Sequence, residues 1–144
     1  MNLFTIGFTQ KSARTFFDAI KTSGVKRVLD IRLNNVSQLA GFTKKTDLEF
    51  FLGEICGVEY IHLPILSPTQ LILDNYRKRK GSWADYERDF LQLMDERDIT
   101  SFIGRDLISD GCLLCSEAKP NYCHRRLISE SLRTVWPDLK IKHL

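Results

Sequence analysis

Residues 111–132 read GCLLCSEAKPNYCHRRLISESL, and this stretch is the most informative one for the fold. It begins with small and apolar residues, continues as a polar loop and ends in a pattern that places Leu127, Ile128 and Leu132 on one face of a helix. Many α/β proteins use such a strand, loop and helix start to hold an anion or to expose a reactive side chain. We therefore expect the fold and the functional residues to be organised around this segment.

The chain outside this segment repeats the alternation of strand and helix. Apolar strands are predicted at residues 3–6, 25–32 and 58–62, and an alternating edge strand at residues 139–144. The helices predicted between the first three strands carry apolar stripes, and each ends at a glycine. The sequence therefore predicts an α/β fold: a single domain over residues 1–144, built as a Rossmann-like three-layer sandwich around a mostly parallel sheet of about five strands.

The composition is that of an ordinary soluble domain. The 144 residues are 43% hydrophobic and 27% charged, and no run approaches the roughly 18 apolar residues that a membrane span requires. Residues 1–7 lack the basic start and apolar core of a signal peptide, so the predicted location is cytoplasmic, with no membrane partner. In that compartment the four cysteines are expected as reduced thiols, metal ligands or active-site groups rather than as disulfides.

Positive charge is clustered more than it is abundant. The net charge of +3 does not by itself indicate a nucleic-acid-binding protein, but Arg77 to Lys80 form a run of four cations. This run lies in residues 63–81, where no periodicity predicts a helix or a strand. Such a long loop is a candidate lid or partner surface, and its cations would contact phosphate if they lay beside a binding site.

Polar and reactive side chains follow four of the predicted strands. They are Thr9, Asp30, Arg32, His62, Cys115 and Glu117. Because the carboxyl ends of parallel strands meet at the edge where ligands bind, we expect one composite site, with Thr9 and His62 among its ligand-binding residues. Asp30 and Arg32 share a face of their strand. They form either a structural ion pair or a clamp in which Arg32 binds an anion while Asp30 orients it or acts as a base.

The cysteines differ in what their positions predict. Cys112 and Cys115 are three residues apart, so their side chains point to opposite faces of a strand, and Cys112 is expected in the core. Cys115 ends that strand. Cys123 is expected in the first turn of a helix, where free N–H groups and cations lower the pKa of a thiol. The candidate catalytic residues are therefore Cys115, Glu117, Cys123 and His124, with a thiolate as nucleophile and His124 or Glu117 as acid or base.

A zinc site is the main competing interpretation of these residues. Cys115, Cys123 and His124 have the right chemistry, and Glu117 or His62 could complete the set. Adjacent residues on a helix diverge by about 100°, however, whereas helical metal ligands are usually three or four positions apart. The spacing of Cys123 and His124 therefore predicts no metal.

Arg125 is the remaining candidate, and it is expected to bind an anion. It lies in the first turn of the predicted helix, where the helix dipole already favours negative charge. Arg126, the next residue, is expected on an outward face. A purely structural interpretation also remains open, in which the whole segment is a satisfied polar cluster that ties the loop to the sheet.

Five short motifs match a family pattern. They are Ile6-Gly7-Phe8-Thr9, Leu29-Asp30-Ile31-Arg32, Tyr60-Ile61-His62-Leu63, Leu114-Cys115-Ser116-Glu117 and Cys123-His124-Arg125-Arg126. Together they cover nearly the whole chain and resemble the domain-of-unknown-function family 488 (DUF488). The resemblance implies a small α/β protein whose shared site contains Cys115, Glu117, Cys123, His124 and Arg125. Residues 34–36 and 64–67 depart from the family pattern, so specificity carried by these loops is expected to differ.

Two classes of function follow from these residues. The first is a small enzyme that acts on an anionic ligand, either a nucleotide or a nucleic-acid phosphate, with a cysteine nucleophile. The second is a non-catalytic regulatory module, associated with nucleic acid or binding a metal, in which the cationic run contacts phosphate. The sequence indicates no particular cofactor and leaves the oligomeric state open.

Overall fold

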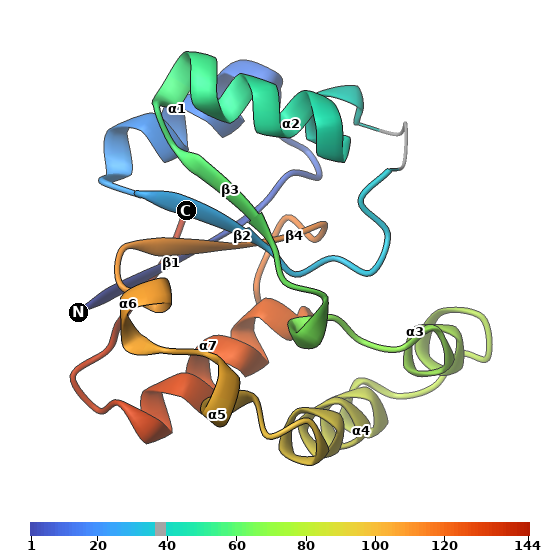
Figure 1. Ribbon diagram of the computed structural model, residues 1–144. Helices are drawn as coiled ribbons and strands as arrows, with labels where there is room; N and C mark the ends of the chain where they lie inside the picture. The colour runs from blue at the N-terminus through green and yellow to red at the C-terminus, as the bar shows by residue number, and fades with distance from the viewer. Residues whose placement is uncertain (37–39) are drawn as a thin grey trace.

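The computed structural model describes residues 1–36 and 40–144 (Figure 1). Its strands are β1 (Asn2–Gly7), β2 (Arg27–Asp30), β3 (Glu59–His62), β4 (Gly111–Cys115) and β5 (Lys140–His143). Its α-helices are α1 (Ala13–Ser23), α2 (Lys45–Phe51), α3 (Gln70–Arg77), α4 (Trp83–Glu96), α5 (Ile99–Phe102), α6 (Arg105–Ile108) and α7 (His124–Val135). Short helical turns of other types are η1 (Gly41–Thr43), η2 (Leu52–Cys56) and η3 (Pro64–Leu66). Within the described residues, no helix is long and apolar enough to cross a lipid bilayer.

The sheet has five strands, all parallel, in the order β3-β2-β4-β1-β5. The predicted α/β fold is confirmed, and the sheet is parallel throughout rather than mostly parallel. β5 is an edge strand that pairs with β1, as its alternating sequence predicted. The register aligns Gly7 with Cys115, and Asp30 with both Leu114 and His62. Four of the strand ends that carry polar groups therefore meet at one edge.

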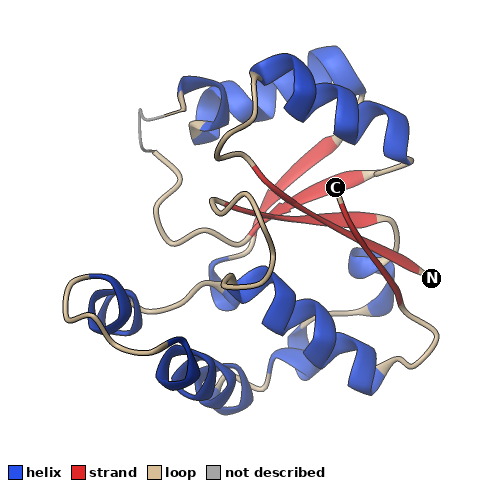
Figure 2. Ribbon diagram, turned by 180° about the vertical axis from the view of Figure 1, so that it is seen from behind, coloured by secondary structure: helices blue, strands red, loops and turns tan. Residues whose placement is uncertain are grey.

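Side chains alternate along the strands and divide the core into two layers. Helices cover both faces of the sheet (Figure 2). Phe4 and Ile6 pack with α1 and α2 on one face, whereas Leu3 and Leu113 pack with α4 and α7 on the other. Cys112 belongs to the first layer and Cys115 to the second. The three-residue spacing therefore turns the two thiols to opposite faces, as predicted, and Cys112 is a core residue.

Residues 63–81 are more regular than the sequence predicted, because they contain η3 and the helix α3. The Oγ1 of Thr69 accepts a hydrogen bond from the backbone N–H of Ile72 and caps the start of this helix. Ile72, Leu73 and Tyr76 pack against the second core layer but all stay partly exposed. This apolar stripe is short and half-buried, so its helical period did not stand out beside the neighbouring prolines and cations.

The chain leaves the neighbouring strands β2 and β4 in opposite directions. From β2 it continues through α2 to β3 at one edge of the sheet, and from β4 it continues through α7 to β5 at the other edge. The helices α2 and α7 cover opposite faces (Figure 1). Ligands of parallel α/β proteins bind where connections diverge in this way, beyond the carboxyl ends of the strands.

Candidate functional site

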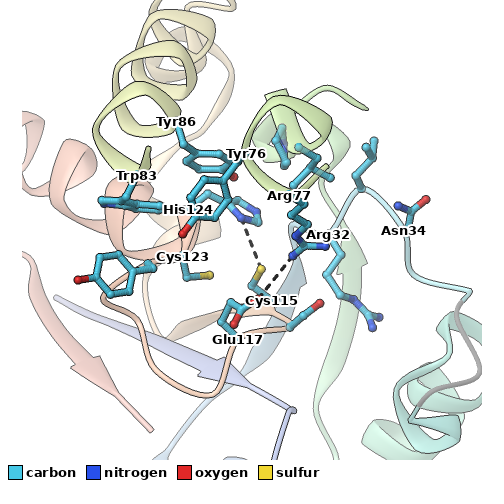
Figure 3. Close-up of a pocket in the computed structure, with 15 residues that line it drawn as sticks. Arg32, Asn34, Tyr76, Arg77, Trp83, Tyr86, Cys115, Glu117, Cys123 and His124 are labelled. Carbon is cyan, nitrogen blue, oxygen red and sulfur yellow. Dashed lines mark hydrogen bonds and ion pairs between the residues drawn. The ribbon is translucent and has the colours of Figure 1, made fainter. Parts of the chain in front are cut away.

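A cleft opens at this divergence, beside the residues that end β2 and β4 (Figure 3). Its floor holds the buried side chains of Cys115, Cys123 and His124. One wall is aromatic, and the other carries Arg77, Arg32 and Asn34 (Figure 3). The structure therefore brings three of the four predicted catalytic residues together at the floor of one cleft, and the fourth, Glu117, lies at its rim.

The imidazole of His124 is fixed in one tautomer. Its Nε2 lies 2.9 Å from the carbonyl oxygen of Ile31, directly after β2. A carbonyl oxygen can only accept, so Nε2 must carry the hydrogen. In the neutral ring, Nδ1 is then unprotonated, and it lies 3.4 Å from the Sγ of Cys115. His124 is thus oriented to take the proton of the Cys115 thiol, an arrangement that activates cysteine nucleophiles.

The Cys115 and Cys123 thiols differ in acidity. The hydrogen bond from Cys123 is the largest influence that lowers the pKa of Cys115, whereas burial opposes it. Backbone N–H groups of Ser116 and Glu117 and the positive charge of Arg125 lower the pKa of Cys115 further. The same hydrogen bond, reinforced by burial, raises the pKa of Cys123. Cys115 is therefore the more acidic thiol of the pair, and Cys123 donates a hydrogen bond to its sulfur.

Cys123 is the N-cap of α7 and does not lie in its first turn. Its backbone is extended, with φ −140° and ψ 138°, so the divergence expected for adjacent helical residues does not apply. The two sulfurs and one ring nitrogen of His124 lie within 4.8 Å of one another and can supply three ligands to a metal such as zinc. The Nη1 of Arg125 lies 3.6 Å from the Cys123 sulfur, however, and its charge opposes a cation there.

Arg125 is fully buried and does not line the cleft. Its Nη1 donates to the carbonyl oxygen of Glu117, and its Nη2 donates to that of Ala118 over 3.3 Å. Its Nε has no hydrogen-bond partner among the described residues, and the ion pairs found within 1–36 and 40–144 do not include it. A buried cation without a carboxylate favours negative charge on a neighbouring group, and the charge of Arg125 is one of the influences that lower the pKa of Cys115.

Thr9 fastens the same loop from the other side. Its Oγ1 donates to the carbonyl oxygen of Ser116 over 2.6 Å, and its backbone N–H donates to that oxygen over 3.0 Å. Thr9 lines a second groove that shares Arg32, Arg77 and Glu117 with the cleft, but it does not line the cleft itself. Its geometry is that of a residue that shapes the loop after β4.

Asp30 and Arg32 form a buried ion pair with two parallel contacts, Nε to Oδ1 and Nη2 to Oδ2, both 2.9 Å. The Tyr60 hydroxyl donates to the same carboxylate over 2.5 Å, and Arg32 also donates to the carbonyl of Thr43. Burial alone would raise the pKa of Asp30, but these bonds and the charge of Arg32 hold it below its usual value. The pair secures the end of β2, next to the Ile31 carbonyl that orients the imidazole.

His62, which was predicted as a ligand-binding residue, ends β3 and does not line the cleft. Its Nε2 lies 3.4 Å from the backbone carbonyl oxygen of Arg32. This contact is long for a hydrogen bond, so it constrains the ring weakly. His62 therefore belongs to the surroundings of the Asp30–Arg32 pair rather than to the cleft floor.

The cleft walls contain residues that the sequence did not assign to the site. Trp83 stacks on Tyr86 with ring centroids 4.8 Å apart, and it contacts Tyr122 edge-on at 5.6 Å. Tyr76 completes this aromatic wall. Trp83 has the helical spacing of a core residue, because it lies three positions before the buried Tyr86 on α4. The only sequence feature that could have placed Trp83 at a site is its position directly after the polar residues 77–82, at the start of the helix that carries Tyr86.

Arg77 reaches the cleft from the end of α3, and its Nη2 lies 3.5 Å from the Oε1 of Glu117 (Figure 3). Both side chains are exposed, at 57% for Arg77 and 50% for Glu117. Such an exposed ion pair contributes only about 0–1 kcal/mol, so either partner can exchange the other for a ligand. The first cation of the basic run thus lies beside the site, the condition under which the sequence predicted a phosphate contact.

These features define an α/β protein with a cysteine–histidine cluster at the carboxyl edge of a parallel sheet. The family model described as "Domain of unknown function DUF488" matches residues 12–132. The chain therefore belongs to the DUF488 family, as its motifs predicted. No curated protein and no solved structure shows significant similarity to it.

Proposed function

We propose that this DUF488 protein is an enzyme in which Cys115 attacks an anionic ligand that carries a flat ring, such as a nucleotide. One observation carries the proposal: the Ile31 carbonyl, the His124 imidazole and the Cys115 sulfur form a hydrogen-bonded series at the floor of an open cleft. A nucleophile, a base beside it and a third group that orients the base are the parts that cysteine catalysis requires.

The proposed chemistry begins with proton transfer from the Cys115 thiol to the Nδ1 of His124. The thiolate then attacks an electrophilic atom of the ligand, and the imidazolium returns its proton to the leaving group. Backbone N–H groups of Ser116 and Glu117 already lower the pKa of Cys115, and donors in this position also stabilise negative charge that develops near the sulfur. The buried guanidinium of Arg125 supports the same charge from below the loop.

The cleft walls support the class of ligand. An anionic group can replace Glu117 as the partner of Arg77, because their exposed ion pair is weak. A flat ring can stack on the wall formed by Tyr76, Trp83 and Tyr122, and base stacking on an aromatic side chain contributes about 1–3 kcal/mol. A nucleotide combines both features.

Alkylation kinetics test the nucleophile. We expect iodoacetamide at pH 7 to label Cys115 first, despite its burial, because the thiolate is the reactive species and this cysteine opens onto the cleft. Cys115→Ser should abolish the fast phase, whereas the matched variant Cys112→Ser should keep it, since Cys112 lies in the other core layer. Peptide mapping identifies the labelled residue. Slow labelling of Cys115 in the native protein would overturn the proposal.

Ligand binding is tested with adenosine 5′-monophosphate, followed through tryptophan fluorescence, because Trp83 lines the cleft whereas Trp136, the other tryptophan, does not. Saturable quenching is expected, with inorganic phosphate competing weakly because it lacks the ring. Arg77→Ala should weaken binding, whereas Arg79→Ala, a neighbouring cation outside the cleft, should leave it unchanged. Equal losses in both variants would indicate a diffuse effect of charge, and no quenching at millimolar nucleotide would exclude this ligand class.

A metal-binding regulatory module is the second candidate function, because three ligand atoms of the kind that zinc prefers lie within 4.8 Å of one another. Elemental analysis and native mass spectrometry of the purified protein test it. One zinc per chain that is lost in both Cys115→Ser and Cys123→Ser, but kept in Cys112→Ser, would favour this function. If the module also binds nucleic acid through Arg77 to Lys80, its affinity for an oligonucleotide should fall steeply with salt.

A further inference from the structure

The two cysteines of the cleft floor belong to different structural elements, because Cys115 lies in the sheet and Cys123 lies at the end of a loop. Cys115 ends β4 inside the sheet, where it aligns with Gly7 of β1. Cys123 ends the loop 116–123 in an extended conformation. Both are free cysteines that line the same cleft. We propose that a hydroperoxide oxidises Cys115 and that Cys123 then resolves it as a reversible disulfide, an inference that rests on the nucleophilic role which the proposed function assigns to Cys115.

The geometry allows this bond without rearrangement of the sheet. The two sulfurs lie within 4.8 Å of each other, and a disulfide requires about 2.0 Å, so they must approach by about 2.8 Å or less. Cys123 stands at the N-cap of α7, where its carbonyl oxygen accepts from the N–H of Arg126 and its own N–H donates to the carbonyl oxygen of Pro120. Rotation of its side chain, together with movement of the loop before it, can supply the approach. The other two cysteines offer no competing partner, because Cys112 faces the opposite layer and Cys56 packs beside Phe17 in that layer.

The oxidation balances with the groups present and one hydroperoxide, ROOH. The Cys115 thiolate attacks the terminal oxygen, the O–O bond breaks, and the departing RO⁻ takes the proton of the His124 imidazolium as ROH. Cys115 becomes a sulfenic acid. Cys123 then gives its proton to His124 and attacks the Cys115 sulfur; the S–O bond breaks, and the hydroxide takes that proton as water. Two thiols and ROOH thus yield one disulfide, ROH and H₂O.

The surroundings of Cys123 suit a resolving thiol better than a first nucleophile. Its sulfur lies 3.6 Å from the Nη1 of Arg125, so the thiolate that forms during the second step has a cation beside it. Both cysteines are buried, at 6% and 3% exposure, so a small hydroperoxide reaches them more readily than a peptide disulfide such as oxidised glutathione.

Mass spectrometry after treatment with one equivalent of hydrogen peroxide tests the inference. We expect a chain about 2 Da lighter, a single crosslinked peptide pair joining Cys115 to Cys123, and recovery of fast alkylation after dithiothreitol. Cys112→Ser should form the same disulfide. Cys123→Ser should stop at the sulfenic acid, which dimedone traps on Cys115.

Three outcomes would overturn the redox inference. The first is dimedone labelling of Cys115 in the native protein with no disulfide, and the second is a disulfide that involves Cys56 or Cys112. The third is disulfide formation that is as fast with oxidised glutathione as with hydrogen peroxide. The proposed function can fail separately. Fast alkylation of Cys115 without any crosslink would support Cys115 as the nucleophile and contradict the resolving role of Cys123. A crosslink without nucleotide binding would support the redox pair and contradict the nucleotide as ligand.

Discussion

The Nε2–H of His124 donates to the backbone carbonyl oxygen of Ile31, 2.9 Å away, and this one contact decides which nitrogen faces Cys115. The carbonyl belongs to the residue directly after β2, and the histidine begins α7, so two elements far apart in sequence are joined at the site. Because Nε2 carries the hydrogen, the lone pair of Nδ1 in the neutral ring faces the sulfur of Cys115.

Replacing His124 by phenylalanine should therefore shift the pH dependence of Cys115 alkylation. The aromatic ring still packs on Phe90, but the base is lost and the Ile31 carbonyl has no donor, which costs about 1–3 kcal/mol of folding stability. The wild-type rate should reach half its maximum below the ordinary thiol pKa, and the variant's midpoint should lie higher. His62→Phe is the matched control. Identical midpoints in wild type and His124→Phe would show that the imidazole does not activate the thiol.

Gly7→Ala should disturb the same site from beneath the loop. A methyl group at position 7 would lie 1.7 Å from the carbonyl oxygen of Glu117 and 2.8 Å from the Nη1 of Arg125. The loop after β4 must then move away from β1, so we expect a loss of about 1–3 kcal/mol in urea unfolding together with slower alkylation of Cys115. Gly53→Ala has open space around its added carbon and should neither lower the unfolding free energy nor slow alkylation. Unchanged alkylation in Gly7→Ala would show that the loop's position does not control the thiolate.

Most of the fold could be predicted because its elements carry strong periodic patterns. The strands are short apolar runs, and the three-residue offset between Cys112 and Cys115 places them on opposite faces by simple parity. The helix α3 could not be predicted in the same way. Its apolar residues cover only half a face, because one side of the helix borders the open cleft rather than a core.

The members of the site were predictable in part: Cys115, Glu117, Cys123, His124 and Arg32 line the cleft, whereas Thr9, Asp30, His62 and Arg125 do not. Strand ends of a parallel sheet meet at one edge, so Asp30 and Cys115 were expected near each other. The burial of Arg125 and the extended N-cap at Cys123 depend on the path of the loop between them, which no spacing rule specifies. The aromatic wall was missed for a related reason, since Trp83 has the helical spacing of a core residue.

Asp30→Asn should weaken the fold in a pH-dependent way. The folded pKa of Asp30 lies below its unfolded value, so its contribution is complete above about pH 4 to 5 and is lost as the pH falls through the folded pKa. At pH 7 the variant leaves Arg32 buried without its carboxylate, and we expect a loss of about 3–5 kcal/mol in urea unfolding. Between pH 5 and about pH 2 the wild type should lose stability more steeply than the variant.

The exposed Asp95 provides the matched control for this linkage, because Asp95→Asn removes the same charge without a buried partner. It should leave both the unfolding free energy at pH 7 and its dependence on acid nearly unchanged. If Asp30→Asn and the wild type lose stability in parallel as the pH falls, the Asp30–Arg32 pair does not account for the acid sensitivity of the fold.

Arg125→Met should raise the pKa of the Cys115 thiol, because the buried guanidinium is one of the groups that hold it low. The alkylation midpoint should move to higher pH, and the rate at pH 7 should fall. The carbonyls of Glu117 and Ala118 also lose their donor, at about 1–3 kcal/mol of stability. Arg126→Met removes an equal charge that pairs with surface carboxylates, so its midpoint should match the wild type. Arg125→Lys keeps the cation and should restore much of the midpoint shift even if stability stays reduced; equal midpoints for the Met and Lys variants would refute the electrostatic role.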